Sequence, residues 1–212
     1  MIEYILFDAA NTLIHKPDLW NKMDEVLKNH GFKVNQKELK LKHKLLSEFI
    51  KFPDVTSELF YNKFNTELLN SLGIVENEEL LLDIFNNCTY LPWKAFHDTK
   101  FINNYNCEIG VLSNFNMKLN SILEQELPYL KFKNIFISEE EKVSKPNLKF
   151  FEIAIKKIGI APEKILYIGD SLKLDIIPAL KMGLQVKLID REETYKSSKY
   201  CLNSFENITL DL

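Results

Sequence analysis

The stretch Tyr4–Leu13, which reads Y-I-L-F-D-A-A-N-T-L, decides how the rest of the chain is interpreted. It begins with the short apolar run Tyr4–Phe7 and stops at Asp8. An apolar run of this length is typical of a strand that is buried on both faces of a parallel sheet. A carboxylate that directly follows such a strand lies at the carboxyl edge of the sheet, where open α/β sheets bind ligands. Asp8 is therefore either a functional carboxylate or a residue that forms a turn.

Further apolar runs recur in the second half of the chain, and helical segments separate them. They are Glu108–Leu112, Asn134–Ile137, Lys164–Ile168 and Gln185–Ile189. The first of these ends at Ser113 and Asn114, and the third ends at Asp170. Strands and helices that alternate in this way predict the α/β class, with a Rossmann-like parallel sheet of about five strands covered by helices.

Residues 18–88 interrupt this alternation with four amphipathic helical segments in a row. Apolar side chains recur in them at helical spacing, which indicates that each helix buries one face. Four such helices in succession are typical of a small bundle. We therefore expect an α/β core of residues 1–16 and 92–212, with a helical cap of residues 17–91 inserted into it.

The composition argues against several classes of protein. The chain has 212 residues, of which 46% are hydrophobic, so it can bury a core and an insertion. Its net charge of −3 gives no reason to expect a nucleic-acid partner. No apolar run reaches the ~18–20 residues of a membrane span, no signal peptide opens the sequence, and the three cysteines lack metal-binding or disulfide spacing. We expect a soluble, cytoplasmic protein with no membrane partner. The sequence does not indicate its oligomeric state.

Polar side chains at the ends of the predicted strands point to one chemistry. Because parallel strands end at the same edge of a sheet, Asp8, Ser113 and Asp170 are expected to converge. The two carboxylates suit a shared hard cation such as Mg²⁺. Ser113 and nearby N–H groups can hold an anion, and Lys145, before Pro146, offers a fixed positive charge. This combination suits phosphoryl transfer to an aspartate nucleophile.

Most of these side chains also have an ordinary structural interpretation. Ser113 can cap the helix that follows it, Lys145 can be a surface lysine, and Asp175 can stabilise a helix N-terminus. Asp170 is harder to explain in this way, because a lone carboxylate at a buried strand end is costly without a cation.

Four segments together resemble the motifs of the haloacid dehalogenase-like hydrolases, in the subgroup whose helical cap follows the first motif. These segments are D-A-A-N-T-L (Asp8–Leu13), V-L-S-N (Val111–Asn114), Lys145-Pro146 and G-D-S-L-K-L-D (Gly169–Asp175). Each motif alone is a weak signal, but four in order with suitable gaps are a strong one. The resemblance implies a Mg²⁺-dependent phosphatase that acts on a small phosphorylated metabolite.

The resemblance also implies a role for each residue. Asp8 is expected to be the nucleophile that forms an aspartyl-phosphate. The expected ligands of Mg²⁺ are Asp8, Asp170 and the backbone carbonyl of Ala10, with Asp175 in support. The expected phosphate-binding groups are Ser113, Asn114 and Lys145.

The first motif departs from the family pattern at two positions. The family's second aspartate is Ala10 here, and the glycine after it is Asn11. The missing carboxylate normally protonates the leaving group and later activates water, and such assistance is worth roughly 10²–10⁴-fold in rate. Asn11 tolerates unusual backbone angles, so we expect the tight loop to persist.

This departure leaves four interpretations open. The first is a phosphatase that takes its acid from elsewhere, with His15 and His97 as candidates, or that works without one. The second is a phosphonate-type hydrolase that uses a cap lysine such as Lys42 or Lys51. The third is a haloacid dehalogenase, which Asp170 disfavours because dehalogenases use no metal. The fourth is a catalytically idle fold that binds a phosphorylated ligand or a protein partner.

Overall fold

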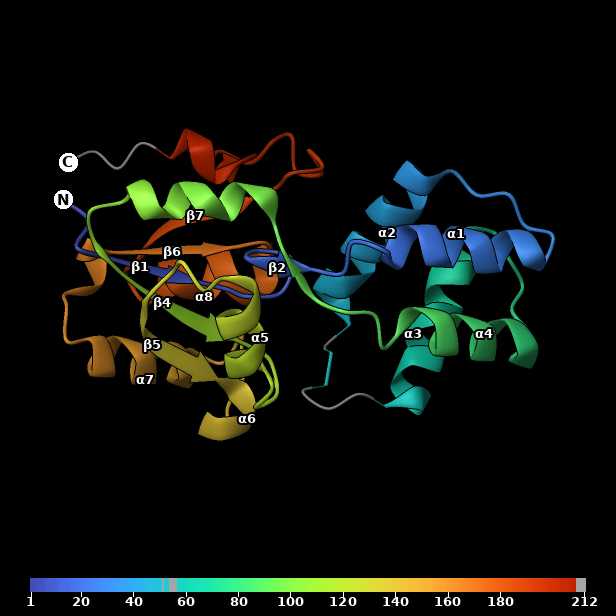
Figure 1. The fold of residues 1–212 in the computed structure, drawn as a ribbon, viewed down its shortest axis with the longest axis horizontal. Helices are drawn as coiled ribbons and strands as arrows, with labels where there is room; N and C mark the ends of the chain where they lie inside the picture. The colour runs from blue at the N-terminus through green and yellow to red at the C-terminus, as the bar shows by residue number, and fades with distance from the viewer. Residues whose placement is uncertain (51, 54–56, 209–212) are drawn as a thin grey trace. The chain divides into compact units, whose positions relative to one another are not determined.

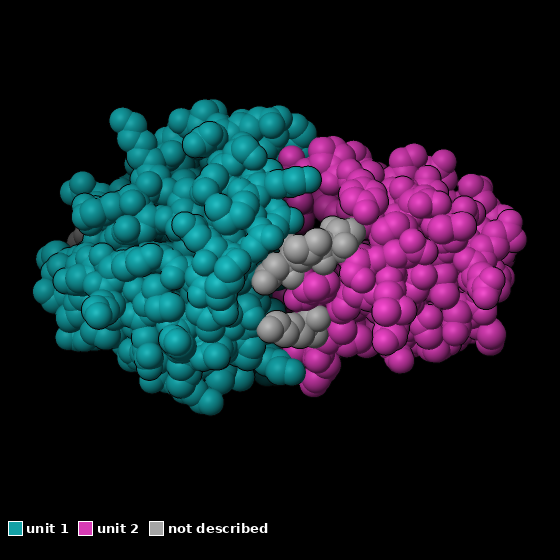
Figure 2. Space-filling view, turned by 90° about the horizontal axis from the view of Figure 1, so that it is seen from below, with its two compact units in different colours: residues 1–15, 94–212 teal, residues 16–93 magenta. Residues whose placement is uncertain are grey.

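A computed structural model of the protein describes residues 1–50, 52–53 and 57–208. The chain divides into two compact units, which Figure 2 shows in different colours. Unit 1 comprises Met1–His15 and Lys94–Leu212, and unit 2 comprises Lys16–Trp93. In the described residues, no helix has the length and apolar character that crossing a membrane requires.

Unit 1 is built on a parallel sheet whose strand order is β5-β4-β1-β6-β7-β8. Its strands are β1 (Tyr4–Phe7), β4 (Glu108–Ser113), β5 (Phe132–Ile137), β6 (Ile165–Gly169), β7 (Gln185–Ile189) and β8 (Cys201–Leu202). All four residues of β1 are buried, as expected for a central strand covered on both faces. The α/β class is confirmed, but the described sheet has six strands and not about five. The two-residue strand β8 has no apolar run that could have predicted it.

Helices cover both faces of this sheet. They are η1 (His97–Asn104), α5 (Leu119–Glu126), α6 (Ser138–Glu141), α7 (Leu148–Ile158), η2 (Pro162–Lys164), η3 (Leu172–Ile176), α8 (Ile177–Lys181) and η4 (Phe205–Asn207). Alternate residues of a strand face opposite sides. Tyr4 and Leu6 therefore pack in one core cluster with Phe150 of α7, whereas Phe7 meets Phe205 of η4 edge to face at 5.6 Å. Figure 1 shows η1, in bright green, beside the red η4.

Two tyrosine hydroxyls connect strands that are not neighbours in the sheet. Tyr4 of β1 donates to Asn134 Oδ1 of β5 at 2.9 Å, with β4 between these two strands. β4 has Gly110 at this point, where a Cβ would lie 2.3 Å from the Tyr4 hydroxyl. Tyr167 of β6 reaches the Leu112 carbonyl of β4 at 3.2 Å, with β1 between them. Burial raises the pKa of both phenols, so both hydroxyls remain protonated.

The chain enters and leaves unit 2 through a pair of very short strands. These strands, β2 (Ile14–His15) and β3 (Lys94–Ala95), are antiparallel. The N–H of Phe96 extends the pairing by donating to the Leu13 carbonyl at 3.0 Å. Two-residue strands have no periodicity, and the sequence did not predict them.

Unit 2 contains four helices within the described residues. They are α1 (Leu19–Asn29), α2 (Gln36–Phe49), α3 (Glu58–Ser71) and α4 (Glu78–Cys88). Polar side chains accept backbone N–H groups at the starts of three of these helices, and these caps are Asn35, Ser57 and Asn77. The helices enclose an apolar cluster of their own that includes Leu27, Phe64 and Leu80.

Candidate active site

Lys145 lies at the centre of the candidate site and is not a surface lysine, because only 2% of it is exposed. Its Nζ donates to Asp8 Oδ1 at 2.6 Å and to Asp175 Oδ1 at 2.6 Å. Burial opposes protonation of Lys145, but the carboxylates of Asp175 and Asp8 outweigh it and raise its pKa. Lys145 therefore remains a cation. It lies between Asp8 and Asp175, which are far apart in the sequence. The loop that carries it brings its charge directly to the residue after β1.

The Asp8 carboxylate is held from two sides. Ser113, at the end of β4, donates its hydroxyl to Asp8 Oδ1 at 2.9 Å, the same oxygen that Lys145 contacts. The Ser113 side chain therefore takes part in the site, and it does not cap the following helix. Burial raises the pKa of Asp8 to about 6, and the positive charge of Lys145 opposes that rise. At neutral pH Asp8 is predominantly ionised and can act as a nucleophile.

Three carboxylates at this edge are arranged to share a cation. Asp8, Asp170 and Asp175 each offer an oxygen within 4.8 Å of the others. Asp175 accepts the Ser171 N–H through Oδ2 at 3.0 Å. Its close approach requires Gly169, because a Cβ there would lie 2.4 Å from Asp175 Cγ.

The charge and the donor atoms of this cluster fit a hard divalent cation. Three carboxylates and the ammonium of Lys145 leave a net charge of −2 in a largely buried place. Such a charge is costly without compensation. Carboxylate oxygens are also the ligands that Mg²⁺ prefers.

Asn114 positions Lys145 through both ends of its side-chain amide. Its Oδ1 accepts the Lys145 N–H at 2.7 Å, and its Nδ2 donates to the Lys145 carbonyl at 3.0 Å. The sequence suggested that Asn114 binds phosphate. In the structure the side chain of Asn114 contacts the backbone of Lys145, and its role in phosphate binding stays a prediction.

Tyr167 belongs to the site and was missed in the sequence. Its hydroxyl lies 3.2 Å from Lys145 Nζ and 2.9 Å from Asp175 Oδ1. In the sequence it looks like one more apolar residue of Ile165–Ile168. A signal was available, because a tyrosine in a strand that is buried on both faces needs a partner for its hydroxyl.

Comparison with known proteins identifies the family. The family model for the haloacid dehalogenase-like hydrolases matches residues 2–183. The chain belongs to this family. Two curated relatives match most of its length: haloacid dehalogenase-like hydrolase domain-containing protein 3 of Danio rerio, 23% identical over 92% of this chain and 88% of that protein, and glyceraldehyde 3-phosphate phosphatase of Methanothermobacter thermautotrophicus, also 23% identical with the same coverage.

A solved structure of a haloacid dehalogenase-like hydrolase has the same fold. The magnesium-bound hydrolase YfnB of Bacillus subtilis is 17% identical to this chain and superposes with a TM-score of 0.66. The match covers 98% of this chain and 99% of that one. At this identity the likeness concerns the fold.

This hydrolase keeps the tight first-motif loop although Ala10 and Asn11 depart from the pattern. Asn11 takes the left-handed conformation, with φ of 60°, which asparagine tolerates better than most residues. Neither candidate for the missing acid hydrogen-bonds Asp8 in the described part of the chain. The ring of His15 stacks on Phe96, and that of His97 is exposed beside Lys100.

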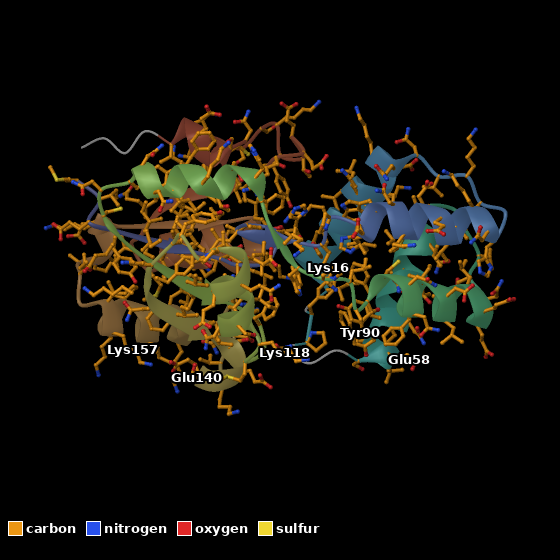
Figure 3. The ribbon with its side chains drawn as sticks, in the orientation of Figure 1. Lys16, Glu58, Tyr90, Lys118, Glu140 and Lys157 are labelled. Carbon is orange, nitrogen blue, oxygen red and sulfur yellow. The ribbon has the colours of Figure 1, made fainter. Side chains whose placement is uncertain are left out.

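The cap lysines suggested from the sequence differ in what the structure says of them. Lys42 pairs with Glu38 at 2.8 Å, and Lys51 lies outside the described residues. A lysine that the sequence did not single out is Lys16, the first residue of unit 2, which is labelled in Figure 3. It donates to the Thr89 carbonyl, and burial lowers its pKa.

Proposed function

We propose that this hydrolase is a Mg²⁺-dependent phosphatase that acts on a small phosphorylated metabolite through an aspartyl-phosphate on Asp8. One observation carries the proposal: a nucleophile-competent carboxylate shares a buried edge with two further acids and a lysine. The relative named glyceraldehyde 3-phosphate phosphatase supports a phosphorylated substrate. We further propose that unit 2 acts as the cap that selects it.

The residues proposed to hold Mg²⁺ are Asp8, Asp170 and the backbone carbonyl of Ala10, with Asp175 in support. When bound, the ion neutralises charge that develops on the phosphoryl oxygens. Lys145 supplies a second positive charge at Asp8 Oδ1, and Asn114 keeps its backbone in place.

The proposed reaction has two displacements at phosphorus. In the first, an Asp8 oxygen forms a bond to phosphorus, and the bond from phosphorus to the leaving oxygen breaks. Because Ala10 has no acid to give, that oxygen takes its proton from solvent. In the second, water attacks the same phosphorus and releases inorganic phosphate, a proton and the free Asp8 carboxylate. Lys145 and the Ser113 hydroxyl, which already donate to Asp8, also bind the phosphoryl oxygens.

The test is release of phosphate from p-nitrophenyl phosphate and from a panel of small phosphorylated metabolites. It is run with Mg²⁺, with a chelator, and with the near-isosteric variant Asp8→Asn. We expect turnover that requires Mg²⁺ and disappears in Asp8→Asn. Turnover that survives in this variant would refute Asp8 as the nucleophile. A folded wild-type protein without turnover on any substrate favours the idle fold.

The variant Ala10→Asp tests the missing acid. Restoring the carboxylate is expected to raise the phosphatase rate, within the roughly 10²–10⁴-fold that general acid–base assistance provides. The gain in the first step should be larger for alkyl phosphates than for p-nitrophenyl phosphate, whose leaving group needs little protonation. Unchanged or lower rates on all substrates would show that another group already serves as the acid.

Carbon–phosphorus bond hydrolysis is a second candidate, which Lys16 favours: burial lowers the pKa of its amine, and a lower pKa makes a lysine more able to form a Schiff base. An aldehyde-bearing phosphonate is incubated with the protein and borohydride, and the adduct is located by peptide mass spectrometry. An adduct on Lys16 that is absent from Lys16→Met supports this candidate. A protein without any lysine adduct excludes it for that substrate.

A further inference from the structure

Arg191 is the only arginine of the chain, whereas the other 26 of its 27 basic residues are lysines. The two side chains are not equivalent. Arginine presents five N–H donors in a planar fork and can bind several acceptors at once, whereas lysine offers a compact charge. The contacts of the one arginine show how its fork is used.

The guanidinium of Arg191 binds one carboxylate and two backbone carbonyls. Its Nε and Nη2 donate side by side to Asp98 Oδ2 and Oδ1 at 3.0 and 2.8 Å. Nη2 also donates to the Thr12 carbonyl at 3.0 Å, and Nη1 donates to the Asn11 carbonyl at 3.3 Å. Both carbonyls belong to the first-motif loop that follows Asp8. Because the pair with Asp98 fixes the plane of the fork, it also fixes where these two carbonyls lie.

The same guanidinium stacks on the ring of Phe96, the residue that directly follows β3. Its Cζ lies 3.8 Å from the centre of the Phe96 ring, and the His15 ring lies 4.0 Å from that centre at an interplanar angle of 10°. Two groups cannot both lie this close to one ring face, so Phe96 is sandwiched between them. His15 ends β2 and Phe96 follows β3. Arg191 therefore contacts the first-motif loop at Asn11 and Thr12, and it also contacts Phe96, on whose other face His15 lies.

Asp98 connects this arrangement to the C-terminal segment. Its Oδ2 also accepts the Phe205 N–H at 3.2 Å, and Phe205 packs against Phe7 directly before Asp8. Burial lowers the pKa of Arg191, whereas Asp98 and Asp170 act in the opposite direction. The guanidinium therefore interacts electrostatically with Asp170, one of the three carboxylates of the candidate site.

We propose that Arg191 is a positioning residue for the first-motif loop. Its fork sets the backbone of Asn11 and Thr12, and with it the placement of Asp8 and of the Ala10 carbonyl. Small displacements of a reacting group, of the order of 1 Å, can lower a rate about 10²-fold. The kinetic part of this proposal rests on the proposed function, but the structural part does not.

The test compares Arg191→Lys and Arg191→Met with wild type by steady-state kinetics, by thermal melting and by hydrogen exchange of the amides in residues 9–14. We expect both variants to lose about 10- to 100-fold in kcat, with a smaller change in KM and faster exchange in this segment. Tyr105→Phe is the matched control. It removes the Tyr105 bond to the Phe205 carbonyl and loosens the same C-terminal segment, but it leaves Arg191 and its carbonyl partners in place.

The outcomes separate positioning from charge and from stability. If Arg191→Lys keeps the wild-type kcat and exchange, a positive charge is sufficient and the proposal is overturned. It is also overturned if Tyr105→Phe, at an equal fall in melting temperature, loses as much kcat as Arg191→Met. If wild type itself turns over no substrate, the proposed function fails, and exchange in residues 9–14 decides alone: faster exchange in Arg191→Lys supports positioning, and unchanged exchange overturns it.

Discussion

The two cations that contact the first-motif segment, the buried Lys145 and the partly buried Arg191, are held in contrasting ways. Lys145 places a compact charge between the side chains of Asp8 and Asp175. Among the described residues, Arg191 binds one carboxylate, that of Asp98, and its other donors bind main-chain carbonyls. The lysine contacts groups that we propose to react or to hold the metal, whereas the arginine contacts the main chain that carries those groups. A compact ammonium suits the first set of contacts, and a planar fork with several N–H donors suits the second.

Removing Lys145 should have the largest effect on the protein. Lys145→Met leaves the Asp8 and Asp175 carboxylates buried without their cation, and breaking a buried pair in this way destabilises by about 3–5 kcal/mol. We expect a loss of this size in the free energy of unfolding, measured by chemical denaturation, together with loss of phosphatase activity.

An exposed ion pair of the same length provides the control. Lys157 of α7, labelled in Figure 3, lies 2.6 Å from Glu141, but 56% of its side chain is exposed. Solvent screens such a pair, so Lys157→Met should change stability by at most about 1 kcal/mol. Equal losses in Lys157→Met and Lys145→Met would contradict the importance of burial at Lys145.

Crowding the Lys145 cluster without removing a charge should have an intermediate effect. In Gly169→Ala the new Cβ meets Asp175, which must shift, and overpacking of this kind costs about 1–3 kcal/mol. Activity should fall with the displaced carboxylate. Gly110→Ala crowds the Tyr4 hydroxyl to a similar degree and serves as a matched control, expected to lose stability but to keep more of its activity. Similar residual activity in the two variants would argue that Asp175 is dispensable.

A partly buried histidine in unit 2 sharpens the contrast, because its effect on stability depends on pH. In unit 2, His43 packs against Trp20 and Phe64, with ring centroids 5.1 and 4.9 Å away, and burial lowers its pKa from 6.5 to about 4. Because the unfolded chain binds the proton more tightly, stability is complete above pH 6.5 and falls as the pH drops towards 4. The loss is at most about 3 kcal/mol, and the partial exposure of this residue reduces it.

The measurement is the free energy of unfolding between pH 7 and 4, in wild type and in His43→Phe. The variant keeps an aromatic ring but cannot titrate, so the difference between the two pH profiles isolates His43. A constant difference across this range would contradict the lowered pKa.

Elements with a strong local pattern could be predicted from the sequence. β1, β4 and β6 are apolar runs buried on both faces, and α7 begins after Pro146 and ends at Gly159 as expected. β2, β3 and β8 could not be found in this way, because two residues have no periodicity and their pairing depends on distant segments. The sixth strand therefore appears only once the chain is folded.

The same distinction applies to the candidate site. Asp8, Ser113 and Asp170 follow predicted strands, and the common edge of a parallel sheet brings such residues together. Arg191 and Asp98 are 93 positions apart, and no local pattern links them. The rarity of arginine in this chain was a usable signal, as was a tyrosine inside a fully buried strand at Tyr167. The roles of these residues stay predictions until the variants are measured.

The two tyrosines that each reach past an intervening strand have a mechanical consequence. Neighbouring strands in this parallel sheet are joined by ladders of main-chain hydrogen bonds. The Tyr4 hydroxyl adds a hydrogen bond from β1 to β5, and the Tyr167 hydroxyl adds one from β6 to β4. Both bonds pass over strands in the middle of the sheet. Sliding any of these four strands relative to the others would stretch at least one of these two hydrogen bonds, so the part of the sheet that carries Asp8 resists shear.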